Sequence, residues 1–354
     1  MSERMERARA LLPVCEVDAL LVWNLSNVRY LSGFTGTEGC LVIGASRAFF
    51  LSDSRYATQA EDQVDGFDIR IGSDKIKNIA AALGDLGATR VGFEDETLPV
   101  ARLKAVEDAA NGAKFSGVGK RVDALRLRKD PEEIAVMRRA AWAAEVGFKA
   151  ALAMTRPGVT ENELALELEM GMRRAGATKP SFDLIVASGP RGALPHGIAS
   201  DRRLEDGDMV VFDFGCVLEG YCSDQTVTVA LGNVGEEERK VYEIVREAQE
   251  RALDALRPGV ALKDVDHAAR DYIDKAGYGA YFGHGLGHGV GLEIHEDPRL
   301  SRVSEFVAEP GMVVTVEPGI YLPERFGVRI EDTVVITESG YDKLTSIDKN
   351  WMTV

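Results

Sequence analysis

The chain contains little cysteine and no long apolar run. Its 354 residues include four cysteines, and none of the four belongs to a CxxC pair. A set this sparse does not make a disulfide scaffold, so we expect reduced, buried thiols at Cys15, Cys40, Cys216 and Cys222. No segment approaches the roughly 20 apolar residues of a membrane helix, and the apolar run near the start is too short for the core of a signal peptide. We therefore expect a cytoplasmic protein without a membrane partner.

Positive charge is scarce as well. Lysine and arginine number 42 against 57 aspartates and glutamates, which gives a formal net charge of −15. Binding to nucleic acid requires clustered Lys and Arg, so we exclude a nucleic-acid partner. A composition of 45% hydrophobic and 28% charged residues excludes disorder, because it supplies ample material for buried cores. The length exceeds the roughly 250–300 residues at which a single core stops growing, and therefore indicates two domains.

The first part of the chain alternates β-rich runs with helical patterns, which is typical of an α/β layer structure. We expect a first domain at 1–123 and a second at 130–354, joined by a basic segment. Asp130 followed by Pro131 predicts a helix start, and apolar residues at helical spacing continue to Met154. The expected strands of the first domain are residues 18–23, 40–44, 47–52, 67–71 and 90–95.

The second half contains an internal repeat. Three short segments recur in the same order, which chance explains poorly. We therefore expect an α/β (α+β) domain made of two units related by a pseudo-twofold axis, each a helix pair followed by two strands. The matching pairs are RPGV at 156–159 and 257–260, GDMVVFD at 207–213 and GMVVTVE at 311–317, and SDQTVTV at 223–229 and IEDTVVI at 330–336.

The repeat brings acidic residues into register. Asp213 corresponds to Glu317, and Asp224 corresponds to Glu331. A twofold axis would bring these four carboxylates to one place, where like charges drive one another's pKa up unless they are neutralised. Two divalent cations would neutralise them, and carboxylate-bridged metal pairs activate water. The alternative for any single acid is plain exposure to solvent, but the matched register of all four favours a metal site.

Histidine is rare and clustered. Four of the five histidines lie within residues 196–295, namely His196, His284, His288 and His295. In residues 283–291 glycine occupies every second position, so in an extended segment His284 and His288 would share the opposite face. Glycine on one face would permit close approach by another backbone.

Other interpretations of these histidines and glycines are weaker. No P-loop lysine follows the glycines, no GxGxxG fingerprint opens a helix, and no HExxH motif occurs. His267 lies in an ordinary amphipathic pattern and is interpreted as a helix residue without a role in chemistry.

As a set, these motifs resemble the pita-bread metallopeptidase family (M24), which includes methionine aminopeptidase, aminopeptidase P and prolidase. The matching runs are SFDLIVASG, LPHG, DFG, GYCSD, GHGLGHGVGLEIHE, TVEPGIY and GVRIEDT. In the first half, NVRYLSGFTGTEGCLVI and FLSDSRYATQAED resemble the amino-terminal domain of the aminopeptidase P, prolidase and creatinase branch. Methionine aminopeptidases lack that domain, so the resemblance implies cleavage before proline.

The resemblance implies a site for two divalent metal ions. Its five ligands fall on Asp213, Asp224, His288, Glu317 and Glu331, with Asp224 and Glu331 bridging the ions. Four carboxylates and one imidazole favour Mn²⁺ or Co²⁺, with Zn²⁺ as an alternative. A water or hydroxide that bridges the ions would then attack the scissile carbonyl.

The resemblance also implies the residues that act on the substrate. Glu317 is the expected base, and His196 and His295 are expected beside the substrate, where they stabilise the oxyanion and help the nitrogen leave. His284 matches a position that lines the substrate pocket. Arg329 is expected either to anchor a substrate carboxylate or to orient the ligands, with a plain ion pair to a ligand acid as the alternative.

One position departs from the family pattern, since Val227 stands where an arginine is common. Metal binding should survive, but a charge near the ligands is lost. We expect an Xaa-Pro aminopeptidase or Xaa-Pro dipeptidase (prolidase), whose partner is a small peptide with proline at the second position. The resemblance also implies a homodimer. The alternatives are a creatinase-like C–N hydrolase without metal and a metal-free binding module, both of which would be expected to lose ligands.

Overall fold

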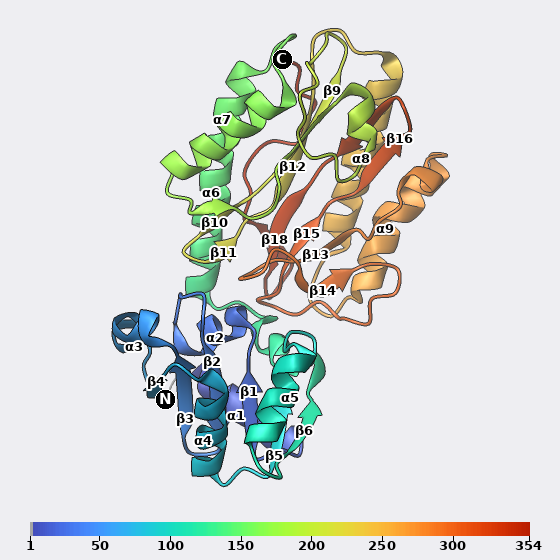
Figure 1. The fold of residues 1–354 in the computed structure, drawn as a ribbon. Helices are drawn as coiled ribbons and strands as arrows, with labels where there is room; N and C mark the ends of the chain where they lie inside the picture. Colours follow the sequence, from blue (N-terminus) through green and yellow to red (C-terminus); the bar gives the residue numbers. More distant parts are fainter. Residues whose placement is uncertain (1–2) are drawn as a thin grey trace. The chain divides into compact units, whose positions relative to one another are not determined.

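A computed structural model describes residues 3–354, which form two compact units, residues 3–126 and Leu127–Val354. Figure 1 colours the first unit from blue to green and the second from green to red.

The first unit is built on a six-stranded sheet in the order β4-β3-β2-β1-β5-β6. Strands β1, β2 and β3 pair antiparallel, whereas β4, β5 and β6 each join their neighbour in parallel. The five runs expected as strands are all confirmed, and β6 is an addition at the edge. The strands are β1 (Ala19–Val22), β2 (Cys40–Gly44), β3 (Ala48–Ser52), β4 (Asp68–Ile71), β5 (Arg90–Phe93) and β6 (Lys114–Gly117).

Helices pack on this sheet through apolar faces. Ile79 and Leu83 of α4 and Val106 of α5 are buried in a core with Val42 and Phe49 of the sheet. The helices of the unit are α1 (Glu3–Val14), α2 (Leu25–Ser32), α3 (Ala57–Gln63), α4 (Lys75–Leu86) and α5 (Val100–Ala109).

The first half of the second unit places two helices on a three-stranded sheet in the order β12-β9-β8. Helix α6 begins as expected after Asp130, whose side chain accepts from the Glu133 amide while Glu133 accepts from the Asp130 amide. Strands from the same part of the chain form a second, small sheet in the order β11-β10-β7. The elements are α6 (Pro131–Met154), α7 (Glu161–Arg174), β7 (Lys179–Pro180), β8 (Ile185–Ser188), β9 (Met209–Phe214), β10 (Cys216–Leu218), β11 (Tyr221–Cys222) and β12 (Gln225–Ala230).

The second half of this unit places another helix pair on a five-stranded sheet in the order β14-β13-β15-β18-β19. Strands β16 and β17 form a separate hairpin. The elements are α8 (Glu236–Ala255), α9 (Leu262–Lys275), β13 (Gly287–Gly289), β14 (Glu296–Leu300), β15 (Val313–Val316), β16 (Gly319–Leu322), β17 (Phe326–Arg329), β18 (Asp332–Ile336) and β19 (Tyr341–Lys343).

The internal repeat corresponds to a repeated architecture. The pair α6 and α7 precedes the antiparallel strands β9 and β12, and the pair α8 and α9 precedes the antiparallel strands β15 and β18 (Figure 1). The expectation of only two strands per unit is wrong, because β8 pairs with β9 and β13 pairs with β15. Each repeat therefore has a third strand beside its central pair.

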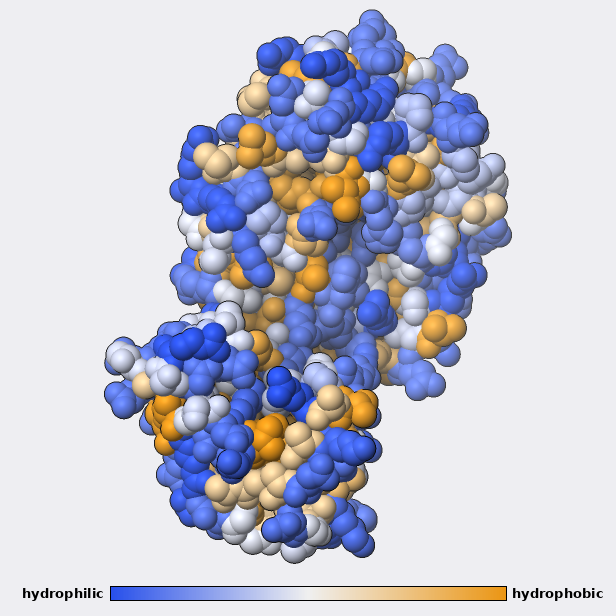
Figure 2. Space-filling model, in the orientation of Figure 1, coloured by the Kyte–Doolittle hydropathy of each residue, from blue (hydrophilic) through white to orange (hydrophobic). Residues whose placement is uncertain are grey.

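Large apolar side chains are exposed at scattered positions of the chain, for example at Val14, Trp142 and Val303. Figure 2 shows a face that is mostly hydrophilic, with hydrophobic residues in small separate groups. In residues 3–354 no helix combines the length and the apolar character needed to cross a membrane. All four cysteines are free thiols; three are buried, and Cys15 is half-buried where a buried thiol was expected.

Candidate metal centre

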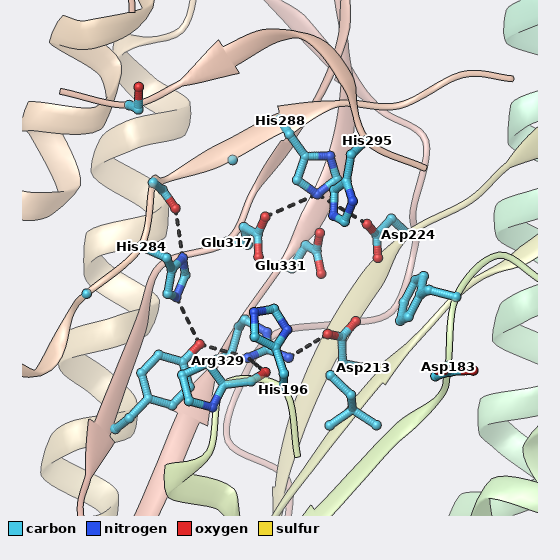
Figure 3. A pocket seen from close by; sticks show the side chains of 18 of the residues that line it. Asp183, His196, Asp213, Asp224, His284, His288, His295, Glu317, Arg329 and Glu331 are labelled. Carbon is cyan, nitrogen blue, oxygen red and sulfur yellow. Dashed lines mark hydrogen bonds and ion pairs between the residues drawn. The ribbon is translucent and has the colours of Figure 1, made fainter. Parts of the chain in front are cut away.

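The second unit contains a cavity of about 830 Å³. Figure 3 shows acidic and histidine side chains from several strands around one space. All nine residues that the sequence indicates for chemistry line this cavity: His196, Asp213, Asp224, His284, His288, His295, Glu317, Arg329 and Glu331.

The four acids come from the two central strand pairs. Asp213 lies on β9 and Asp224 directly precedes β12, while Glu317 directly follows β15 and Glu331 directly precedes β18. Residue Thr226 links the two pairs, because its carbonyl accepts from the Glu331 amide at 3.1 Å and its Oγ1 donates to Glu331 Oε2 at 2.8 Å. The repeat therefore brings the acids together where its two halves meet.

Burial and mutual repulsion disfavour the charged forms of these acids. The pKa of Asp224 is raised well above its usual range by burial and by the charges of Glu331, Asp213 and Glu317. Burial and the charges of Glu317 and Asp213 likewise raise the pKa of Glu331, and burial raises the pKa of Glu317 to about 8. Such a cluster ionises fully only when cations offset its charge.

His288 presents a neutral ring nitrogen to the acids. Its Nδ1 lies 3.0 Å from the carbonyl oxygen of Gly289, so Nδ1 carries the proton and Nε2 carries the lone pair. Burial lowers the pKa of this imidazole to about 3. Nε2 lies 3.5 Å from Asp224 Oδ2 and 3.3 Å from Glu317 Oε1 (Figure 3). A lone pair that faces two carboxylate oxygens is repulsive unless a proton or a metal cation lies between them.

Two carboxylate oxygens have no hydrogen-bond partner. Asp213 Oδ1 and Glu331 Oε1 are buried and unpartnered among the described residues, although buried polar atoms ordinarily find partners. One ligand atom each of Asp224, His288 and Glu331 lies within 4.8 Å of the others. These oxygen and imidazole donors fit a hard divalent cation.

The alternating glycines allow the backbone that carries His288 to pass close to its neighbours. A Cβ at Gly287 would lie 2.0 Å from the carbonyl oxygen of Thr315, and one at Gly289 would lie 2.4 Å from that of Asp297. Only Gly287–Gly289 form a strand, which is shorter than the extended segment 283–291 considered from the sequence. His284 precedes this strand and still lines the cavity.

The other three histidines of the cavity differ in burial and in the groups that they contact. His284 accepts from the Tyr321 hydroxyl at 2.9 Å, and burial lowers the pKa of its ring to about 4. The ring of His295 lies 4.3 Å from that of His288, and partial burial lowers its pKa. His196 is exposed at the cavity wall.

Arg329 is buried and uses most of its donors within the protein. Its guanidinium donates to Asp213 Oδ2 at 2.5 Å, to the Tyr321 hydroxyl at 2.7 Å, to the carbonyl of Pro195 at 3.1 Å and to Thr226 Oγ1 at 3.2 Å. The ion pair with Asp213 corresponds to one of the alternatives considered from the sequence. The remaining donor capacity for a substrate carboxylate is small.

Several residues near the site have no distinct sequence signal. Tyr321 contacts both His284 and Arg329, and Arg299 also lines the cavity. The ammonium of Lys349, which is buried, lies 3.3 Å from Gln225 Oε1 and 3.4 Å from the Thr226 carbonyl. Their partners come from other elements, so local sequence patterns do not reveal them.

Two further residues lie away from the cavity wall. Val227 is buried in the apolar core under β9 and β12, where it contributes packing and no charge. His267 lies on α9 and is half-buried, as expected of an ordinary helix residue.

Two family profiles match the chain. The one described as Metallopeptidase family M24 matches residues 135–338, and the one described as Creatinase/Prolidase N-terminal domain matches residues 4–128. An Xaa-Pro dipeptidase from Pyrococcus horikoshii is 38% identical over 352 residues, which cover 99% of this chain and 98% of the relative.

Solved structures match over both units. An Xaa-Pro dipeptidase from Bacillus anthracis gives a TM-score of 0.97 at 43% identity, with 99% of each chain covered. An X-Pro aminopeptidase from Thermotoga maritima gives a TM-score of 0.92 at 40% identity, with 99% of this chain and 100% of the other covered. The similarity therefore extends over nearly the whole chain.

Proposed function

The chain belongs to metallopeptidase family M24, and on this premise we propose that it hydrolyses the peptide bond preceding proline with two divalent metal ions. The family resemblance and the fold class expected from the sequence are confirmed, and relatives and solved structures make the chain a metallopeptidase of the prolidase type. We propose Xaa-Pro dipeptides, or peptides that begin with Xaa-Pro, as its substrates.

One observation carries the metal proposal. The lone pair of His288 Nε2 faces carboxylate oxygens at 3.3 and 3.5 Å, and two nearby carboxylate oxygens are buried without partners. We propose that the ions would be held by Asp213, Asp224, His288, Glu317 and Glu331. A creatinase-like hydrolase or a binding module without metal would leave this arrangement uncompensated.

Bound divalent ions would acidify a water molecule to a pKa near 7, so that a nucleophile exists at neutral pH. The residues of the chain would guide the rest of the reaction. Glu317 lies at the cluster and is proposed to take the proton of the attacking water. His196 and His295 are proposed to stabilise the oxyanion and the departing nitrogen. His284 is proposed to shape the substrate pocket.

Arg329 is proposed to orient the acids. It holds Asp213 Oδ2 directly, and it donates to Thr226 Oγ1, which in turn donates to Glu331 Oε2. Each acid then has one oxygen fixed and the other oxygen free. Such outer contacts fix ligand geometry and affinity at metal sites.

Further properties stay predictions. These are Mn²⁺ or Co²⁺ rather than Zn²⁺ as the bound metal, assembly as a homodimer, and domain limits at 1–123 and 130–354. Relatives named as dipeptidase and as aminopeptidase match with nearly equal coverage. The choice between the two activities depends on the space beyond the proline.

A comparison of substrates tests this proposal. In Mn²⁺, the protein should cleave an Xaa-Pro dipeptide, and the matched Xaa-Ala dipeptide should be a poor substrate. An Xaa-Pro-Xaa tripeptide then separates the activities: a dipeptidase leaves it intact, and an aminopeptidase cleaves it. Equal cleavage of Xaa-Pro and Xaa-Ala dipeptides, or cleavage of neither the Xaa-Pro dipeptide nor the Xaa-Pro-Xaa tripeptide, would contradict the proposal.

A further inference from the structure

A fully buried carboxylate lies outside the cavity wall, at the first residue of α7. Glu161 has 0% of its side chain exposed. Neither the proposed ligands nor the proposed substrate residues include it. A carboxylate is expensive to bury without partners, so its partners indicate why it is there.

Five donors surround the two oxygens of this carboxylate. Oε1 accepts from the Ser188 amide and from Ser188 Oγ, both at 2.8 Å. Oε2 accepts from the Ser200 amide at 3.1 Å, from Ser200 Oγ at 2.7 Å and from the guanidinium of Arg191. Charge-assisted hydrogen bonds of this kind are stronger than neutral ones.

Two of the donor residues, Ser188 and Ser200, flank residues 189–199, which we call the His196 loop. The third, Arg191, lies within it. Ser188 is the last residue of β8 and directly precedes the loop, and Ser200 directly follows it. Within the loop, Arg191 donates to Glu161 and also to the carbonyl of Ile198 at 2.8 Å. A single carboxylate therefore fixes both ends and the first turn of the loop.

The backbone of the His196 loop determines where the His196 ring lies. This ring is exposed and makes no hydrogen bond to any residue in 3–354. The Pro195 carbonyl of the loop accepts from Arg329 at 3.1 Å, and Arg329 in turn donates to the candidate ligand Asp213. The position of the imidazole is therefore set by the loop and not by contacts of the ring.

We propose that Glu161 is a positioning residue that holds the His196 loop so that His196 reaches the substrate. This inference rests on the proposed function, in which His196 acts in the reaction. A carboxylate suits the task because all five partners are donors. A glutamine would turn an NH₂ group toward donors and leave buried groups unsatisfied.

The test combines a double-mutant cycle with a readout that needs no activity. Glu161→Gln, His196→Ala and the double variant are assayed on an Xaa-Pro dipeptide with Mn²⁺. The matched control is Glu163→Gln, which makes the same change two residues along α7, where the exposed side chain accepts from Thr160 in the helix cap. Metal content and hydrogen exchange of the loop amides are measured for each protein.

Glu161→Gln should lower kcat by roughly 10- to 100-fold, because a displacement of about 1 Å can cost about 100-fold. Metal content and the kinetics of Glu163→Gln should stay at wild-type values. The double variant should be no slower than His196→Ala alone, since Glu161 acts through His196. Multiplying effects in the double variant, or wild-type kcat in Glu161→Gln, would overturn the proposal.

Hydrogen exchange tests the role of Glu161 independently of the proposed function. Exchange in residues 189–199 should accelerate in Glu161→Gln and not in Glu163→Gln, whatever the substrate of the protein. Unchanged exchange would overturn the positioning role, whereas inactivity of the wild type on Xaa-Pro peptides would overturn the proposed function alone. Should Glu161→Gln fail to fold, Ser200→Ala removes a single donor and should show a smaller increase in the same exchange.

Discussion

At the scale of the residue, three of the five candidate ligands, Asp213, His288 and Glu331, share one pattern: one atom is fixed by the protein and another is left free. Arg329 holds Asp213 Oδ2, and Thr226 holds Glu331 Oε2, while the second oxygen of each acid has no partner. The Gly289 carbonyl fixes His288 through Nδ1, and Nε2 faces the acids. The pattern is typical of metal ligands oriented by outer contacts.

Substitution of the histidines should therefore have two distinct effects: loss of metal binding at His288, and loss of rate at His196 and His295. His288→Ala should weaken metal binding by more than about 100-fold, because even the loss of an outer contact costs about 10- to 100-fold. His196→Ala and His295→Ala should keep their metal and lose roughly 100-fold or more in kcat, as oxyanion donors do. Metal analysis and steady-state kinetics measure both effects. Retention of metal by His288→Ala would contradict its assignment as a ligand.

Glu94, in the first unit, should make the stability of the protein depend on pH. Burial raises the pKa of Glu94 to about 7, although its carboxylate accepts from Asn24 N at 2.7 Å and from Asn27 Nδ2 at 2.5 Å. The folded chain then keeps this proton to a higher pH than the unfolded chain, whose carboxyl titrates near 4.5. The protonated carboxyl of Glu94 therefore contributes to stability in full below about pH 4.5. This contribution is lost as the pH rises through about 7.

Chemical denaturation at several pH values measures this contribution. The free energy of unfolding of the wild type, relative to Glu94→Gln, should fall by roughly 3 kcal/mol between about pH 4.5 and pH 8, at 1.36 kcal/mol per pKa unit. Glu96→Gln, an exposed neighbour, is the control and should show no such trend. A difference between wild type and Glu94→Gln that is constant with pH would contradict the prediction.

The four acids could be found from the sequence because they recur in register, and Arg329 could be found from the family resemblance. The other residues around them could not. Thr226, Tyr321 and Lys349 act on partners from other strands or distant segments. Nothing local in the sequence marks which hydroxyl or ammonium faces a carboxylate far along the chain. Glu161 is hidden for the same reason, since its sequence context indicates only the start of a helix.

At the scale of the element, β13 differs most from what its sequence predicts. Its three residues, Gly287–Gly289, have low β propensity, so pairing with β14 and β15 makes them a strand. Strands with β-rich sequences, such as β9, β12, β15 and β18, were predictable from local pattern. Strand β13 was not, because its glycine-rich sequence becomes a strand only through tertiary pairing, whereas β8 has the β-rich sequence IVAS but lies outside the repeated segments.

A substitution in β13 tests the role of close packing there. Gly287→Ala would place a Cβ 2.0 Å from the Thr315 carbonyl oxygen, so β13 and β15 would have to separate. The free energy of unfolding should fall by about 3 kcal/mol or more, and metal affinity should fall because His288 lies on the same strand. Gly283→Ala, where an added Cβ meets nothing within 4 Å, is the control for stability. Equal stability of the two variants would contradict the prediction.

At the scale of the whole molecule, the repeat explains why one cavity collects acids from both halves of the second unit. Each half contributes a helix pair and a central strand pair, and each strand pair brings two acids. This arrangement was predictable from three short matches because repeated sequences fold alike. The local geometry of the cavity was not predictable, since loops such as residues 189–199 are fixed by contacts between distant segments.

In the proposed function, two metal ions at this cavity make the chain a hydrolase of Xaa-Pro bonds. The most direct measurement is a titration of metal-stripped protein with Mn²⁺, in which bound metal and hydrolysis of an Xaa-Pro dipeptide are followed together. Activity should be absent in chelator, should rise with occupancy and should saturate at two ions per chain. Full hydrolysis in chelator, or binding of Mn²⁺ without any hydrolysis, would contradict the proposed function.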